Sequence, residues 1–291
     1  MNPSDSGRED AAKAVNLLAG DVRAPLNFVV RQDTKPYFIS SALTGGDAEF
    51  FFETEAQTVT IRDVRPVADS LSIDMEGFEL YRHETSVEDL YDDAAVEGVY
   101  SREIEALLKA ATGASRVVVF DHTRRADGPR GAVNPDGLRG PAYLVHVDYT
   151  ALSGPERVRN FLGTEEVDRV LGSGGRIVQI NVWRPITGPV QRSPLALAEA
   201  ESIKTEELIA TEQRFPDRVG EIYLLARGSD QRWCWLSGMD RNETLLIKGW
   251  DSLDDGRARF TPHGAFPVPD QDPEAPTRES IETRTYLVFD G

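Results

Sequence analysis

The sequence predicts a mainly β protein with flanking helices, in which the strands form a double-stranded β-helix, the jelly-roll barrel. Short runs rich in β-branched and aromatic residues recur through the second half of the chain, and turn residues separate them. A length of 291 residues is sufficient for a barrel of this kind to form one domain. Regular repeats and low-complexity segments are absent from the sequence.

The sequence of the N-terminal part predicts a less regular segment that precedes this barrel. We expect residues 1–10 to form a disordered leader and residues 11–291 to form a single domain, with 11–115 as a helical and β extension of a jelly-roll core at 116–291. The extension contains β-like runs over 26–31 and 50–61, and a helix between residues 86 and 113. Gly113 is placed to end that helix.

The core opens with a predicted buried strand from Arg116 to Phe120 that ends at Asp121 and His122, before a loop over 124–140. A strand over 141–150 follows. Ser153-Gly-Pro-Glu156 then predicts a helix start with Ser153 as the N-cap, and Gly163 the helix end. A helical turn over 164–172 leads to the glycine cluster 172–175. Since a strand follows this cluster, we do not expect a phosphate loop there. Later predicted strands are 176–183, 221–225, 232–236, 244–248, 258–260 and 280–289, with a helix-biased insert over 195–208.

Composition excludes several classes of function. With 32 Lys and Arg against 49 Asp and Glu, the formal charge of −17 disfavours binding to nucleic acid and to anionic membrane surfaces. No run approaches the roughly 20 apolar residues of a membrane span. The single cysteine, Cys234, fits a reducing cytoplasm and is expected to be a small buried apolar residue.

The most informative motif is His146-Val-Asp148 within the strand over 141–150. Residues two apart on a strand share a face, so the imidazole and the carboxylate lie side by side. These are two of the three ligands of the 2-His-1-carboxylate triad, which leaves three positions open on iron(II). The chain has four histidines, and His263 lies where a later strand can complete the triad.

A second motif, Arg278-Glu-Ser280, follows His263 on the predicted final barrel strand. An arginine and a hydroxyl on one face can bind the distal carboxylate of 2-oxoglutarate, the arginine as a two-pronged donor and the serine as an additional one. Arg284 shares the strand face of Arg278 and competes for this role, but we expect it to lie too far from the triad.

Beyond these motifs, the chain resembles the bacterial and fungal hydroxylase/desaturase family that includes cephalosporin 7α-methoxylase small-subunit-like proteins, AsaB-type enzymes and fungal gibberellin desaturase. The segments that carry the resemblance are Val119-Phe-Asp-His-Thr123, Val145-His-Val-Asp-Tyr-Thr150, Asn181-Val-Trp-Arg-Pro-Ile186, Arg257-Ala-Arg-Phe-Thr-Pro-His263 and Arg278-Glu-Ser-Ile-Glu282.

This resemblance implies a non-haem iron(II), 2-oxoglutarate-dependent oxygenase, with Fe(II), 2-oxoglutarate and O₂ as cofactor and cosubstrates. His146, Asp148 and His263 carry over as iron ligands, and Arg278 and Ser280 as cosubstrate anchors. The expected reaction is hydroxylation or desaturation of an unactivated C–H position in a small specialised metabolite, with release of succinate and CO₂.

Several other residues are candidates for the same site, each with an alternative. Asn181 is expected to hydrogen-bond 2-oxoglutarate, whereas Trp183 on the same strand face either packs beside the substrate or belongs to the core. His122, with Arg124 close by, either faces the substrate or is a satisfied structural histidine. Trp235 is a further candidate for the substrate wall. Two other residues are expected to have no such role: His83 on the surface and Lys248 in a structural turn.

Two competing functions remain open. A cupin-like metal isomerase would use the same barrel without a cosubstrate, and Arg278-Glu-Ser280 argues against it because no dicarboxylate needs anchoring there. An accessory subunit of a biosynthetic oxygenase would keep the fold while a partner reacts, and retention of all three expected ligands argues against it. We expect a small-molecule substrate and a cytoplasmic location, and the sequence leaves open whether the chain forms a homodimer.

Overall fold

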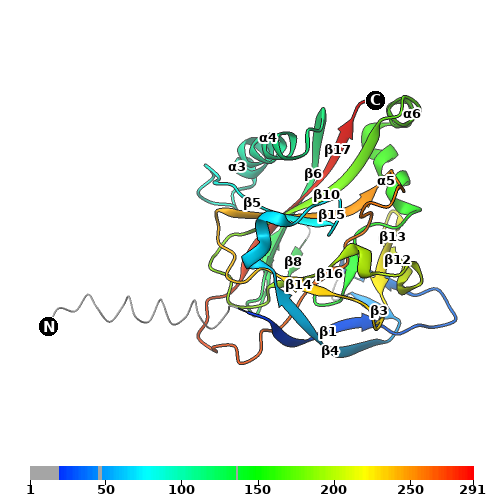
Figure 1. The fold of residues 1–291 in the computed structure, drawn as a ribbon. Helices are drawn as coiled ribbons and strands as arrows, with labels where there is room; N and C mark the ends of the chain where they lie inside the picture. The colour runs from blue at the N-terminus through cyan, green and yellow to red at the C-terminus, as the bar shows by residue number, and fades with distance from the viewer. Residues whose placement is uncertain (1–19, 45–47, 136) are drawn as a thin grey trace.

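The structure is a computed structural model that describes residues 20–44, 48–135 and 137–291. The predicted leader over residues 1–10 lies outside these residues. Two β-sheets pack face to face, with helices on the outside of the smaller sheet (Figure 1). The mainly β, jelly-roll architecture predicted from the sequence is confirmed.

The larger sheet has ten strands and draws on both halves of the chain. Its strands in spatial order are β1 (Val22–Val29), β4 (Thr54–Asp63), β14 (Trp233–Trp235), β11 (Leu195–Ala198), β16 (His263–Ala265), β9 (His146–Val147), β13 (Val219–Leu225), β12 (Leu208–Arg214), β2 (Tyr37–Ile39) and β3 (Glu49–Phe51). A short helix, α2 (Ser41–Thr44), connects β2 towards β3. Strands β1 and β4 of the expected N-terminal extension are therefore built into the same sheet as strands of the core.

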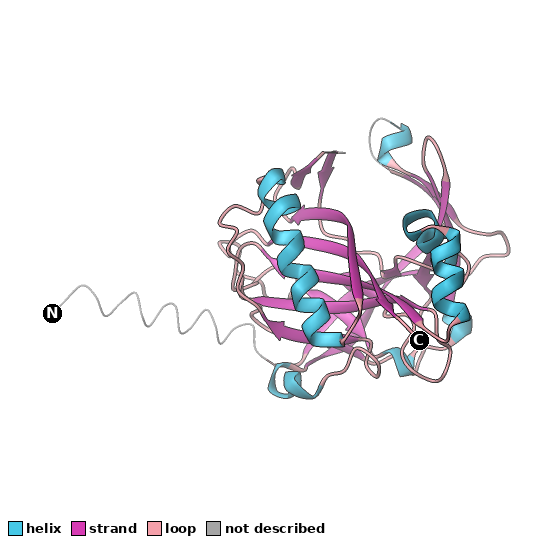
Figure 2. Cartoon of the chain, turned by 90° about the horizontal axis from the view of Figure 1, so that it is seen from above, coloured by secondary structure: helices cyan, strands magenta, loops and turns pink. Residues whose placement is uncertain are grey.

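The smaller sheet is antiparallel and has five strands, β5 (Phe78–Arg82), β15 (Glu243–Asp251), β10 (Arg176–Pro185), β17 (Glu279–Phe289) and β6 (Arg116–Ala126). Its outer face packs on α3 (Asp93–Ala95), the short π-helical turn η2 (Val96–Tyr100) and α4 (Ser101–Thr112), and Figure 2 shows this helical segment crossing the strands. As predicted, the helix ends at Gly113, which adopts a φ of 75°.

The remaining elements lie in the connections between strands. These are η1 (Arg65–Ser70), the hairpin of β7 (Ala132–Asn134) and β8 (Gly137–Arg139), the helices α5 (Ser153–Leu162) and α6 (Thr164–Gly172), and the 3₁₀ turns η3 (Ala200–Ser202) and η4 (Thr205–Glu207). The start of α5 differs from the prediction. Ser153 lies within the first turn, and the hydroxyl of Thr150 accepts the backbone N–H of Ser153 at 2.9 Å in the way expected of an N-cap.

Four other predictions of secondary structure were wrong. The strand predicted over 141–150 is limited to β9, because only His146 and Val147 pair with β13 and β16. The strand predicted to end at Asp121 and His122 continues to Ala126, because pairing with β17 extends along its whole length. The insert over 195–208 begins with strand β11 and continues as 3₁₀ turns, since its alanines and leucines fill a sheet position. Residues 258–260 form no strand.

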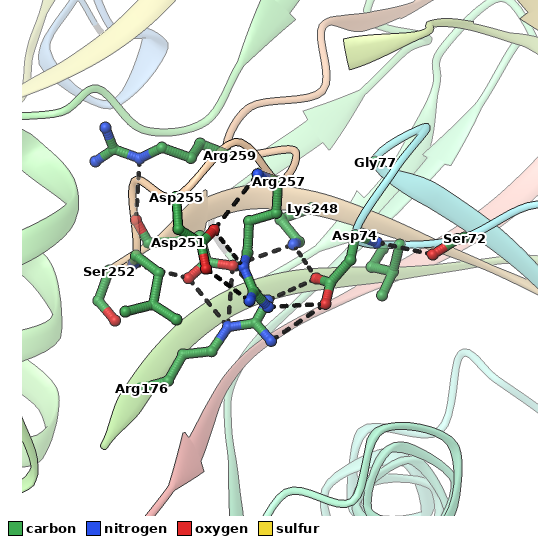
Figure 3. A network of polar contacts seen from close by, with 12 residues as sticks. Ser72, Asp74, Gly77, Arg176, Lys248, Asp251, Ser252, Asp255, Arg257 and Arg259 are labelled. Carbon is green, nitrogen blue, oxygen red and sulfur yellow. Dashed lines mark hydrogen bonds and ion pairs between the residues drawn. The ribbon is translucent and has the colours of Figure 1, made fainter. Parts of the chain in front are cut away.

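One end of the smaller sheet is held by a network of charged side chains (Figure 3). Lys248 lies within β15 and not in the expected turn, and its side chain is fully buried. Its ammonium contacts the carboxylates of Asp74 at 2.5 Å and Asp251 at 3.1 Å. Arg176 contacts the same two carboxylates at 2.6 and 2.5 Å. The network thereby ties the segment before β5 to the start of β10 and the end of β15.

Candidate functional site

The two candidate metal-binding histidines come from adjacent strands of the larger sheet. His146 on β9 and His263 on β16 are directly paired, and their ring centroids lie 4.7 Å apart. Nδ1 of His146 lies 2.8 Å from the carbonyl oxygen of Leu144, and Nδ1 of His263 lies 2.9 Å from that of Thr261. Because a carbonyl oxygen can only accept, each Nδ1 carries the proton, and each Nε2 keeps a lone pair for a metal ion.

Burial keeps the His146 imidazole neutral. Removal from water, reinforced by the neighbouring His263, lowers the pKa of His146 to about 4. The side chain is 16% exposed and His263 is 3% exposed. A neutral imidazole is the form that binds metal, so this ligand does not have to lose a proton near neutral pH.

Asp148 follows β9 and approaches the histidines through one of its two oxygens. Oδ1 lies 3.8 Å from Nε2 of His146. Oδ2 accepts hydrogen bonds from Nδ2 of Asn181 at 2.7 Å and from Nε of Arg284 at 3.1 Å. Burial acts to raise the pKa of Asp148, but the Arg284 cation and the two imidazoles outweigh it and hold that pKa well below its usual value.

The side chains of His146, Asp148 and His263 do not have the spacing of a complete metal site. Within the part of the chain that the structure describes, no group of three or more His, Cys, Asp or Glu side chains has the spacing to hold a metal ion. The chemistry of the donors nevertheless fits iron(II), because two imidazole nitrogens and one carboxylate oxygen are the atoms that this ion takes in facial triads.

Next to the histidines, a small cavity lies between the sheets. It is lined by Arg125, Ala142, His146, Trp183, Leu195, His263, Gly264, Arg278 and Glu282. Arg278 is 2% exposed and donates from Nη1 to Oγ of Ser280 at 3.1 Å. Its other two donor nitrogens, Nε and Nη2, are buried without a hydrogen-bond partner. Unpaired buried donors are costly, so this arrangement suits an incoming acceptor such as a carboxylate.

Two candidates on β10 lie at this site in different ways. Trp183 lines the cavity and also packs in the core between the sheets. Its position therefore agrees in part with each alternative, a place beside the substrate and a place in the core. The amide of Asn181 donates to Asp148, and its oxygen accepts from Nε2 of Gln179 at 2.6 Å. The expected contact of Asn181 with 2-oxoglutarate is therefore replaced by a contact with the candidate ligand Asp148.

His122 and Arg124 lie on the opposite face of β6 from the cavity. Both ring nitrogens of His122 are used, by the hydroxyls of Ser101 and Thr283 at 2.9 Å each. Arg124 is 3% exposed and donates to the carbonyl oxygen of Leu90 at 2.6 Å. Since β6 continues past residue 122, alternate residues point to opposite faces, and these two point to the helical side. The position of His122 therefore agrees with the alternative of a structural histidine whose hydrogen bonds are satisfied.

Trp235 also lies away from the cavity. On β14, Cys234 pairs with Leu197, which in turn pairs with His263, so these three side chains share the face towards the smaller sheet. Trp235 is one residue further along and points to the other face, where it packs on Phe266 with ring centroids 5.7 Å apart. Cys234 is buried as predicted, and burial raises its pKa to about 12.

The sequence analysis gave no role at the site to three charged residues that lie near it. Arg125 and Glu282 line the cavity, and Arg284 contacts Asp148, contrary to the expectation that Arg284 lies too far away. The sequence pattern that could have indicated Glu282 and Arg284 is the alternation of side chains along a strand. Ser280, Glu282 and Arg284 occupy every second position and therefore lie on one face of β17. Similarly, His83 is half-buried and not on the surface, with Nδ1 2.5 Å from Nη2 of Arg184.

Comparison with known proteins decides the family. A family model described as "Oxidoreductase/YMDC permease-like domain" matches residues 26–289. The "Fe(II)/2-oxoglutarate-dependent dioxygenase nvfI" of Aspergillus novofumigatus is 32% identical over 254 residues, which cover 84% of this chain and 88% of that protein. The chain belongs to the Fe(II)/2-oxoglutarate-dependent dioxygenases. As a member of this family it uses Fe(II), 2-oxoglutarate and O₂ and acts on a small molecule.

A second relative and a solved structure agree with this result. The "Hydroxylase/desaturase CTB9" of Cercospora beticola is 33% identical over 256 residues, which cover 81% of this chain and 78% of that protein. The solved structure of the "iron and alpha-ketoglutarate-dependent endoperoxidase NvfI" superposes with a TM-score of 0.81 at 29% identity, covering 94% of this chain and 99% of that one. Among the described residues of this dioxygenase, no helix is long and apolar enough to cross a membrane.

Proposed function

We propose that the dioxygenase binds Fe(II) through Nε2 of His146, Nε2 of His263 and Oδ1 of Asp148. The support is the protonation of the two histidines, since both Nδ1 atoms are bonded to backbone carbonyls and both Nε2 atoms are left for the metal. Three protein ligands leave three positions on the ion for 2-oxoglutarate and O₂.

Arg278 and Ser280 are the proposed anchors of 2-oxoglutarate. The observation that carries this assignment is the pair of buried, unpartnered donors on the Arg278 guanidinium, which open on the same cavity as both histidines. Burial and the nearby Arg125 lower the pKa of Arg278 to about 10, so the group stays cationic at neutral pH. A cation with free donors calls for an anionic ligand, which a cupin-like isomerase does not need at this place.

The proposed reaction is hydroxylation or desaturation of an unactivated C–H position in a small specialised metabolite. The bound iron and 2-oxoglutarate, with O₂, supply an oxidant strong enough to remove that hydrogen. The protein's own residues bind and orient: the histidines and Asp148 hold the ion, Arg278 and Ser280 fix the cosubstrate, and Trp183 closes one wall of the cavity against water.

The same proposal places the protein in the cytoplasm as one domain without nucleic-acid partners. Support comes from the formal charge of −17 and from the single cysteine, which is buried. The strands of the N-terminal segment also pair within both sheets, as expected for a single folding unit.

Anaerobic titration with Fe(II) and 2-oxoglutarate tests the proposed sites. We expect a weak visible charge-transfer band that needs both components and that is lost in Asp148→Ala. With O₂ admitted, slow formation of succinate should follow even without a substrate. A folded wild-type protein that gives neither the band nor succinate would rule out the proposed sites.

A further inference from the structure

The polar contacts of Arg284 point to a role in the site that is different from that of Arg278. Arg284 lies on β17 with its side chain 16% exposed, and Nε donates to Asp148. Nη1 donates to Asp121 at 2.5 Å and to Thr123 at 2.9 Å, and Nη2 donates to Glu282 at 2.7 Å. Every nitrogen of this guanidinium thereby has an acceptor and four of its five N–H donors are occupied, whereas two nitrogens of Arg278 are without a partner.

A second donor reaches the same oxygen of Asp148 from the neighbouring strand. Asn181 on β10 pairs in register with Arg284, and both side chains converge on Oδ2. The orientation of the Asn181 amide is fixed, because its oxygen accepts from Gln179 while its nitrogen faces the carboxylate. Gln179 is fully buried, so this row of side chains is enclosed by the protein.

We propose that Arg284 and Asn181 are positioning residues that hold Oδ2 of Asp148 and so present Oδ1 to the metal. This inference rests on the proposed assignment of Asp148 as an iron ligand. A carboxylate that is held through one oxygen cannot rotate or bind through both oxygens, and it pays less conformational entropy when it takes the ion. Neither residue touches the cosubstrate or the metal in this account.

Gly249 provides the space that this row of side chains needs. A Cβ added at Gly249 would lie 1.9 Å from Oε1 of Gln179. Glycine at this position on β15 therefore allows Gln179 to lie flat against the strand and reach Asn181. A larger residue would push Gln179 away, and the orientation of the Asn181 amide would no longer be fixed.

The test measures affinity for Mn(II), followed by the loss of its free-ion EPR signal, in Arg284→Lys and Asn181→Ala. Arg284→Lys keeps the positive charge but cannot reach three carboxylates at once. We expect each variant to bind Mn(II) roughly 10-fold to 100-fold more weakly, as is usual when the partners of a metal ligand are removed. If Arg284→Lys does not fold, Asn181→Ala, which changes no charge, tests the positioning role by itself.

Arg176→Lys is the matched control, because it makes the same change in the smaller sheet at an arginine that is also 16% exposed. Arg176 contacts two carboxylates, Asp74 and Asp251, and none of the contacts of Arg284 (Figure 3). We expect Arg176→Lys to lower thermal stability and to leave Mn(II) affinity unchanged.

The outcomes separate the two proposals. Folded Arg284→Lys and Asn181→Ala proteins that bind Mn(II) like the wild type, while Asp148→Ala does not bind, overturn the positioning role alone. A wild-type protein that binds no Mn(II), or an Asp148→Ala variant that binds normally, overturns the assignment of Asp148 and this inference with it. Weaker binding in the control as well would mean that loss of stability, and not positioning, explains the effect.

Discussion

His146 and His263 face each other on adjacent antiparallel strands, and each donates Nδ1–H to the carbonyl two residues before it. The same local geometry is thus used twice within one strand pair. Backbone carbonyls cannot move without disturbing the sheet, so both rings are oriented before any metal arrives.

Replacing one of these histidines should abolish iron binding without unfolding the protein. We expect His263→Ala to eliminate the visible band formed anaerobically with Fe(II) and 2-oxoglutarate. His122→Asn is the control, because His122 is a half-buried histidine away from the cavity whose ring nitrogens bond only hydroxyls of Ser101 and Thr283. An intact band in folded His263→Ala would mean that the third ligand has been assigned wrongly.

Loss of the Arg278 guanidinium should act on the cosubstrate and not on the metal. A hydrogen bond to a charged group contributes about 1.5–3 kcal/mol, so we expect Arg278→Ala to raise the concentration of 2-oxoglutarate needed for half-maximal succinate formation roughly 10-fold to 100-fold. Affinity for Mn(II) should stay the same. Ser280→Ala, which removes a neutral partner, should give a smaller increase. A lost metal site with a normal 2-oxoglutarate requirement would contradict the assignment.

Lys248→Met should destabilise the fold strongly although it lies outside the active site. Without Lys248, the buried carboxylate of Asp251 keeps only Arg176 as a cationic partner and the network has one excess negative charge, at a cost of about 3 kcal/mol in the free energy of unfolding. Arg159→Gln is the control, since its partner Asp168 is 61% exposed and such pairs contribute at most about 1 kcal/mol. Chemical denaturation measures both values. Equal, small losses would show that the network in Figure 3 adds little to stability.

His122 should make stability depend on pH. Burial, opposed by the nearby Asp121 carboxylate, lowers the pKa of His122 from 6.5 to about 4. Between these values the unfolded chain binds the proton and the folded chain does not. The contribution of the neutral, buried His122 to the free energy of unfolding is therefore fully present above about pH 6.5. It is lost as the pH drops towards 4.

His122→Asn should remove this contribution. The difference in the free energy of unfolding between wild type and variant is expected to shrink between pH 7 and pH 4.5, by at most about 1.4 kcal/mol per pH unit. Denaturation with urea at each pH gives the two curves. Parallel curves over this range would show that His122 is not the titrating group.

Local patterns in the sequence were enough to predict the jelly-roll architecture and to propose the main residues of the candidate site. His146 and Asp148 could be proposed because alternation along a strand is a local property, and Gly113 could be predicted to end its helix for a similar reason. The anchor pair Arg278 and Ser280 follows from the same alternation. Each of these inferences depends on residues within a few positions of one another.

The remaining features depend on pairing across the sheet, which the sequence does not encode locally. Arg284 was placed too far from the site because its partner Asp148 comes from the other sheet. Trp235 was assigned to the substrate wall although it lies on the other face, because one residue of register exchanges the two faces of a strand. For His122 the same property left the substrate-facing and the structural alternatives open. His122 additionally required knowing that β6 runs on to Ala126.

Asp148 follows a strand of the larger sheet, whereas Asn181 and Arg284, which hold it, belong to the smaller sheet. The spacing between the sheets therefore sets the position of the carboxylate. Apolar residues such as Leu197 and Ile247 fill that spacing from opposite sides. If Asp148 binds the metal as proposed, a change in their size should alter metal binding without replacing any ligand, so the hydrophobic core would tune the proposed metal site.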